Sequence, residues 1–144
     1  MSTHEPLALA RYLFERAPFM QQLGVEVVEA SAEAVVATLT LQPWMTQATG
    51  VAHAGIVTGL ADHAAACAAR LASSGDETFV SIEVHTTLVR PAAGPTLRIV
   101  GKPVRIGKRI SFASAEVFTH DGQQERLCAT FSVSLISAPE RTKA

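Results

Sequence analysis

The segment at residues 53–73 (HAGIVTGLADHAAACAARLAS) constrains the fold of this chain more than any other feature. It contains eight alanines and few helix-breaking residues, and alanine is the best helix former. The predicted helix is apolar almost all round, which is typical of a helix buried in a core. Because its side chains are small, neighbouring strands can approach its axis closely. The segment therefore favours a sheet that curls around one long buried helix.

The rest of the chain predicts a short N-terminal helix and six strands. The helix is expected at residues 7–17, where Pro18 ends it. Strands are expected at residues 24–30, 34–41, 78–90, 96–106, 109–119 and 125–136. Alternation in the third strand places Val80, Ile82, Val84, Thr86 and Leu88 on one face and Ser81, Glu83, His85 and Thr87 on the other. A helix layer on an antiparallel sheet satisfies the packing rule for one core, so residues 1–144 are expected to form a single α+β domain.

Composition and charge exclude several classes of protein. The formal net charge is -1, which argues against a nucleic-acid binder held by bulk positive charge. Two cysteines cannot build a disulfide framework, and no histidine has the spacing of a metal ligand, so no metal or cofactor is expected. The N-terminus lacks the pattern of a secretory signal, and charged residues interrupt the apolar run at residues 51–72. The expected location is the cytoplasm, with no membrane partner.

Asp62 is the residue of the long helix that most needs an explanation. A carboxylate is rarely buried without a partner. One interpretation places Asp62 on the single wet stripe of the helix, paired with Arg70 or His63. The other makes Asp62 a catalytic carboxylate that acts as a base near neutral pH.

The start of the same helix is a second candidate site. Free backbone N–H groups near His53 and Gly55, together with the positive end of the helix dipole, can hold an oxyanion or a carbonyl oxygen. The alternative is that His53 caps the helix and Gly55 packs. His53 and Asp62 point about 180° apart and are separated by roughly 13–14 Å along the axis. One helix cannot easily direct both at one reacting atom, so we expect an obligate dimer whose sites combine the two ends from different subunits.

These residues carry a resemblance to a known family. Gln47, Gly50, residues 53–55 and residues 60–62 together resemble the active-site segment of the hotdog-fold acyl-CoA thioesterases of the phenylacetate-pathway (PaaI-like) type. Residues 80–83, 88–94 and 107–109 fit the same pattern, and the resemblance spans about residues 19–135. It implies the hotdog fold, an antiparallel sheet wrapped around one long central helix. It also implies homodimers or homotetramers with active sites at the subunit interface.

The resemblance also implies a role for each matched residue in hydrolysing an acyl-coenzyme A to the free acid and coenzyme A. Asp62 matches the general base or nucleophile, and Gln47 matches the residue that places the water or the thioester. Ser81 matches a hydroxyl residue that positions the water. His53 matches the histidine that orients the helix start or contacts the thioester. At this helix start, Gly55 and its neighbouring N–H groups match the donors that polarise the thioester carbonyl.

Two positions depart from the family pattern. Ala54 stands where many members have glycine, which keeps the backbone N–H but makes the approach of the substrate tighter. Ala66 stands where some relatives have threonine, so an auxiliary hydroxyl contact is missing. Neither change removes a group that the core reaction needs.

The phosphates of coenzyme A need cations. Arg90, Arg105, Lys108 and Arg109 are the candidates for this contact, and Arg90 and Arg109 are favoured over the other two. The alternative is that they are strand-edge charges that prevent aggregation. Cys67 and Cys128 are expected to be small core residues and not nucleophiles.

Two rival functions remain open from the sequence. One is a hotdog hydratase or dehydratase, but the histidine and acidic spacing of those enzymes is absent. The other is a non-catalytic acyl-CoA binding or sensor protein, but such sensors usually carry a DNA-binding appendage, for which this chain has no room. Acyl specificity is left undetermined.

Overall fold

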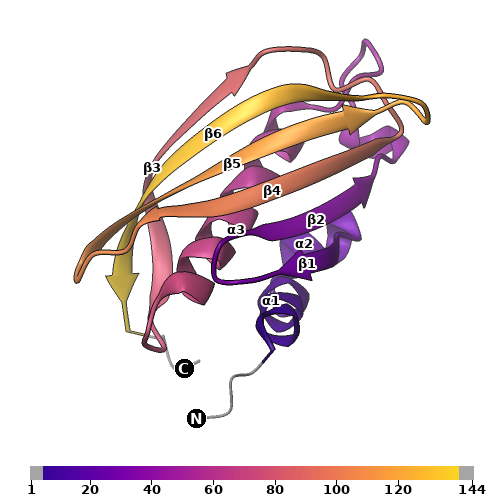
Figure 1. Cartoon of the computed structure of the whole chain (residues 1–144). Helices are drawn as coiled ribbons and strands as arrows, with labels where there is room; N and C mark the ends of the chain where they lie inside the picture. Colours follow the sequence, from indigo (N-terminus) through magenta and orange to yellow (C-terminus); the bar gives the residue numbers. More distant parts are fainter. Residues whose placement is uncertain (1–4, 140–144) are drawn as a thin grey trace.

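A computed structural model describes residues 5–139 of the chain. Its elements in chain order are α1 (Pro6–Glu15), α2 (Pro18–Leu23), β1 (Glu26–Ala30), β2 (Val35–Thr40), the 3₁₀ helix η1 (Pro43–Met45), α3 (Ala54–Ala72), β3 (Thr78–Leu88), β4 (Thr96–Arg105), β5 (Ile110–His120) and β6 (Glu125–Ala138). The strands form one antiparallel sheet in the order β1-β2-β4-β5-β6-β3, and this sheet curls around α3 (Figure 1). The predicted α+β fold, an antiparallel sheet wrapped around one long helix, is confirmed.

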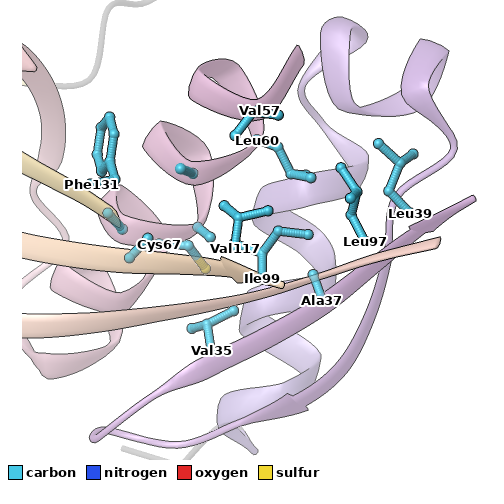
Figure 2. Close-up of a cluster of buried hydrophobic side chains, with 14 of the residues drawn as sticks. Val35, Ala37, Leu39, Val57, Leu60, Cys67, Leu97, Ile99, Val117 and Phe131 are labelled. Atoms are coloured by element: carbon cyan, nitrogen blue, oxygen red, sulfur yellow. The ribbon is translucent and has the colours of Figure 1, made fainter. Parts of the chain in front are cut away.

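The core fills the space between α3 and the inner face of the sheet. Figure 2 shows apolar side chains of α3, among them Val57 and Leu60, together with side chains such as Leu97 and Ile99 from the strands. A Cβ atom at Gly101 of β4 would lie 2.4 Å from the carbonyl oxygen of Ala64, so the strand passes directly against the helix backbone. The expected close approach of strand and helix is therefore confirmed. Within residues 5–139, no helix, α3 included, is both long and apolar enough to span a membrane.

The N-terminal region contains two helices where the sequence predicted one. α1 ends at Glu15, and Pro18 begins α2 instead of only ending a helix. Proline is well suited to the first turn of a helix, because its missing N–H has no intrahelical acceptor there in any case. Gly24 ends α2 with a φ of 75°, a left-handed conformation that glycine adopts without strain.

The predicted alternation of β3 is wrong, because a β-bulge interrupts it. Ser81 pairs with Leu135 of β6, but the next paired residue is Glu83, which faces Ser134. The extra residue, Ile82, shifts the side-chain pattern by one position. Ser81 before the bulge and Thr86 after it consequently both face α3, where each forms a hydrogen bond with a helix side chain.

The two edge strands of the sheet differ in length and in cover. β1 has five residues and packs against α1, whereas β3 has eleven residues and pairs only with β6 among the described strands. Apolar side chains along and just beyond β3 are exposed, namely Val80, Ile82, Val84, Leu88 and Val89. A long open edge with exposed apolar residues is a template for pairing with another strand.

Candidate active site

Asp62 lies on a stripe of α3 that the rest of the described chain leaves partly open. Thr58, Gly59, Asp62 and Ala66 are half-buried, and at 100° per residue they point in similar directions. We call these four residues the open stripe. The Oγ atom of Ser81 donates a hydrogen bond to Oδ1 of Asp62 at 2.6 Å. The bulge in β3 therefore directs a hydroxyl at the carboxylate.

The cationic partners that the sequence suggested for Asp62 are engaged elsewhere. Arg70 donates to Asp76 at 3.0 Å, beyond the end of α3. Nε2 of His63 lies 3.1 Å from the carbonyl oxygen of Leu13, and the His63 ring packs edge-on against Phe14. Within residues 5–139, no lysine, arginine or histidine forms a salt bridge with Asp62. The carboxylate is held by a neutral hydroxyl and is not part of an ion pair.

The start of α3 is capped by a side chain. His53 is the N-cap residue, and its Nδ1 accepts a hydrogen bond from the N–H of Gly55 at 2.9 Å. The carbonyl oxygen of His53 accepts the N–H groups of Ile56 and Val57. Among the described residues, the N–H of Ala54 has no acceptor. The donor that is open to a ligand is therefore that of Ala54, while that of Gly55 is occupied by His53.

A cavity of about 450 Å³ opens beside this helix start. Gln47, His53, Ala54 and Arg90 contribute to its walls, together with apolar residues that include Leu88 and Val89. Nη1 of Arg90 donates to the carbonyl oxygen of Leu127 at 2.9 Å, which holds the guanidinium group against the end of β6. Four of the residues selected from the sequence therefore surround one cavity.

Lys108 and Arg109 lie in a different part of the molecule. They belong to the turn between β4 and β5, near the end of the sheet where Ser137 donates to the carbonyl oxygen of Arg109. The cavity lies near the other ends of these strands, where Ala92 accepts a hydrogen bond from Ala52. Both basic side chains are exposed, and neither lines the cavity of its own protomer.

Asp62 and Ser81 are also outside the cavity. Because His53 lies before the first residue of α3, we use Gly55 to compare the direction and position of the helix start with those of Asp62. Gly55 comes seven residues before Asp62 and points in nearly the same direction, but roughly 10 Å away along the axis. For Gly55, the distance along the helix axis separates the helix start from the carboxylate. One protomer thus holds two groups of candidate residues that do not meet.

A second side-chain hydrogen bond, between two hydroxyl groups, joins α3 to β3, and sequence reasoning missed it. Oγ1 of Thr58 donates to Oγ1 of Thr86 at 3.0 Å. Thr58 precedes Asp62 by one helical turn, so the two contacts with β3 follow each other along the open stripe. The spacing of Thr58 and Asp62 was a usable signal, but the bulge that turns Thr86 inward left no trace in the alternation of β3.

The two cysteines are buried, as predicted. Burial raises the pKa of the Cys67 thiol to about 12 and that of the Cys128 thiol to about 11. Thiols with such pKa values stay protonated near neutral pH. Because the thiolate is the nucleophilic form, neither cysteine is suited to act as a nucleophile. No three histidine, cysteine or carboxylate side chains gather into a metal-binding group anywhere between residues 5 and 139.

Comparison with known proteins places this geometry in a family. The sequence model of the thioesterase superfamily matches residues 49–126, which contain α3, β3, β4 and β5. The 1,4-dihydroxy-2-naphthoyl-CoA hydrolase of Escherichia coli strain K12 is 29% identical over 110 residues, which cover 76% of this chain and 74% of that protein.

Solved structures agree with the fold. The crystal structure of a thioesterase family protein from Silicibacter pomeroyi superposes with a TM-score of 0.87 at 25% identity, covering 92% of this chain and 97% of that one. The PaaI protein of the E. coli phenylacetic acid degradation operon superposes with a TM-score of 0.82 at 22% identity, covering 96% and 97%. The hotdog fold and the resemblance to thioesterases of this type are confirmed. Because the family match extends over more than half of its length, the chain belongs to the thioesterase superfamily and is classed with the thioester hydrolases.

Proposed function

We propose that the protein is an acyl-CoA thioesterase that hydrolyses acyl-coenzyme A to the free acid and coenzyme A, with Asp62 as general base or nucleophile. The observation that carries this proposal is the 2.6 Å hydrogen bond from Ser81 to Asp62 on the open stripe of α3. A hydrogen bond to a charged acceptor fixes the carboxylate in one orientation. No cation within residues 5–139 forms a salt bridge with Asp62, so within the described chain no ion pair competes with a substrate or a water for the carboxylate.

The helix start supplies the complementary half of the chemistry. The Ala54 N–H donates to the thioester carbonyl oxygen as negative charge develops on it, and the helix dipole adds to this stabilisation. His53 keeps the Gly55 N–H oriented through its cap, and a substrate oxygen that replaces Nδ1 gains a second donor. Gln47, in the same cavity, holds the thioester or the water. In one route, Asp62 accepts the proton of the water that attacks the thioester carbon, the C–S bond breaks, and the proton passes to the leaving thiolate of coenzyme A. In the other, Asp62 attacks the carbonyl carbon itself, the thiolate leaves as a mixed anhydride forms, and water then hydrolyses the anhydride to the free acid and the Asp62 carboxylate.

A second copy of the chain brings the two halves together. Along β3, the Ser81 end is level with Asp62, and the Leu88 end is level with the cavity at the helix start. A partner that adds its own β3 antiparallel to this open edge reverses that order. The partner's helix start then lies opposite Asp62, and each dimer holds two composite sites. A homotetramer needs a further interface but no further catalytic residue.

The same pairing gives the basic residues a common ligand. Arg90 lies at the cavity, whereas Lys108 and Arg109 lie at the opposite end of the sheet. Antiparallel pairing brings the Lys108 and Arg109 turn of one protomer toward the cavity of the other. Arg90 from one subunit and Lys108 with Arg109 from its partner then contact the phosphates of coenzyme A. The proposed enzyme acts in the cytoplasm without a metal or other cofactor.

A thiol-release assay tests the activity directly. The wild-type protein is incubated with acetyl-CoA, hexanoyl-CoA and phenylacetyl-CoA, and free coenzyme A is measured with a thiol reagent. A thioesterase releases thiol and free acid in equal amounts. A sensor binds the ligand without releasing thiol, and a hydratase or dehydratase, which acts on enoyl or hydroxyacyl thioesters, also releases no thiol from these three. Absence of thiol release from all three would therefore contradict the proposal.

Mixing two inactive variants tests the composite site. Ala54→Pro removes the open N–H at the first helical residue, a position where proline is tolerated, and Ala54→Ser keeps that N–H as the matched control. Asp62→Asn removes the base. After subunit exchange, a mixture of Ala54→Pro and Asp62→Asn is expected to regain about a quarter of the wild-type turnover, because about half of the dimers are mixed and each mixed dimer has one intact site. No recovery after proven exchange would show that each site lies within one protomer.

A further inference from the structure

Two different walls border the open stripe on either side of Asp62. Thr58 lies about 40° to one side of Asp62 around the helix, and Gly59 lies about 60° to the other. On the Thr58 side, β3 contributes the hydroxyl groups of Ser81 and Thr86. On the Gly59 side, the neighbour is the phenyl ring of Phe19 from α2. The carboxylate therefore lies between a hydroxyl wall and an aromatic wall.

Phe19 is seated on the backbone of α3. A Cβ atom at Gly59 would lie 2.7 Å from Cε1 and 3.3 Å from Cζ of the Phe19 ring, so the ring edge occupies the space that any other side chain would fill. Glycine is among the least favourable residues inside a helix. What glycine provides here is the close approach of the ring, one helical turn before Asp62.

Phe19 is exposed, unlike the long apolar side chains of Met20 and Leu23 in the same helix. Phe19 is 48% exposed, whereas Met20 and Leu23 are each 3% exposed and belong to the core. Phe19 thus touches α3 with one edge and leaves much of its apolar surface uncovered within the described chain. A fixed apolar surface beside a polar reacting group is the arrangement by which pockets sort ligands.

We propose that Phe19 is a specificity-determining residue that contacts the apolar part of the acyl group, an inference that rests on the proposed thioesterase function. The acyl chain lies along the aromatic wall, while the thioester carbon and the attacking water lie toward Asp62 and the hydroxyl wall. Acyl groups with several apolar carbons or a phenyl ring reach Phe19, and an acetyl group does not. The preferred substrates are consequently thioesters of medium-chain or aryl-substituted acids.

The test measures kcat/KM of Phe19→Ala with acetyl-CoA, hexanoyl-CoA and phenylacetyl-CoA. The variant is expected to lose about tenfold on the two larger substrates, which is in the range for losing apolar contacts in a pocket, and less than about twofold on acetyl-CoA. Tyr12→Ala is the matched control, because Tyr12 is an aromatic residue of α1 that is 55% exposed and packs against Arg16. It is expected to leave all three values unchanged.

Gly59→Ala provides a second variant that leaves Phe19 in place. Its methyl group displaces the ring and is expected to lower the ratio of hexanoyl-CoA to acetyl-CoA turnover, as Phe19→Ala does. In the double variant, Gly59→Ala is expected to add nothing to that ratio, because its effect acts through the ring. Equal losses on all three substrates, an unchanged ratio, or the same shift in Tyr12→Ala would overturn the inference while leaving the proposed function intact. If the wild type releases no thiol from any of the three, the proposed function fails, and this inference fails with it.

Discussion

Asp62 and His63 are neighbours in sequence on the same helix, yet they face opposite surroundings. Asp62 belongs to the open stripe and accepts a hydrogen bond from Ser81 of β3. His63 lies about 100° further round the helix, where the carbonyl oxygen of Leu13 accepts its Nε2–H and the ring of Phe14 packs against it. Both are polar residues in an alanine-rich segment, and both are half-buried.

The difference lies in what each contact uses. His63 joins α3 to α1 through a hydrogen bond to a backbone group and an aromatic contact, and both of these partners belong to its own protomer. One oxygen of Asp62 accepts a hydrogen bond from a hydroxyl group, and no cation of the described chain forms a salt bridge with the carboxylate. The contacts of His63 join two elements of the fold and therefore contribute to stability. The Asp62 carboxylate lies beside an open surface, where a ligand can approach it.

The largest expected effect is on Asp62. Asp62→Asn keeps the size of the side chain and an acceptor for Ser81 but removes the basic carboxylate. We expect kcat to fall by roughly 10²–10⁴-fold, the usual contribution of a general base, while the urea midpoint of unfolding stays at the wild-type value. Thiol release and urea titration, both at one protein concentration, measure the two quantities.

Asp76→Asn is the matched control for this prediction, because Asp76 is an exposed carboxylate paired with Arg70. It is expected to retain wild-type turnover. Unchanged kcat in a folded Asp62→Asn protein would remove Asp62 from the reaction and with it the distinction from His63.

The opposite pattern is expected for His63. His63→Leu fills the space but leaves the carbonyl oxygen of Leu13 without its donor, and loses the edge-on contact with Phe14. Removing one partner of a partly buried hydrogen bond costs about 1–3 kcal/mol of the free energy of unfolding. Urea titration at a fixed protein concentration should show this loss, with kcat of the folded enzyme within about twofold of wild type. A collapse of kcat without a loss of stability would place His63 in the site instead.

The sequence alone predicted the long helix and the succession of strands along the chain, because these depend on local composition and on periodicity along one segment. It also selected Asp62 as a candidate, and that role stays a prediction. The alanines of α3 and the positions of turns were sufficient for the fold. The sequence predicted only that Pro18 ends a helix. A proline after one helix and a proline in the first turn of the next give the same local signal, so the start of α2 at Pro18 was missed.

The arrangement of the site was less accessible, because it depends on contacts between distant segments. Strict alternation put Ser81 and Thr86 on opposite faces of β3, and a single inserted residue at Ile82 brings them to the same face. Gln47, His53, Ala54 and Arg90 share a cavity because a loop, a helix start and a strand end converge there, which no spacing in the sequence records. The role of Gly59 could not be predicted from the sequence, because it depends on a contact with the ring of Phe19 from a distant segment.

The smallest expected effect is a dependence of the stability on pH that comes from the titration of His63. Burial lowers the pKa of His63 below its usual value of 6.5, against the smaller opposing effects of the Leu13 carbonyl and the Asp62 charge. The unfolded chain therefore binds a proton at a higher pH than the folded chain does. Stability is unaffected by this group well above pH 6.5, and it declines as the pH falls through 6.5 toward the folded-state pKa.

Urea titrations of the wild type and of His63→Leu at pH 7.5 and pH 5.5 measure this effect. We expect the wild type to lose more stability between the two pH values than His63→Leu loses. The comparison between variants cancels the contribution of the carboxylates that both proteins share. An equal loss in wild type and His63→Leu would mean that the ring is solvated in the folded state, and the contrast with Asp62 would then rest on hydrogen bonding alone.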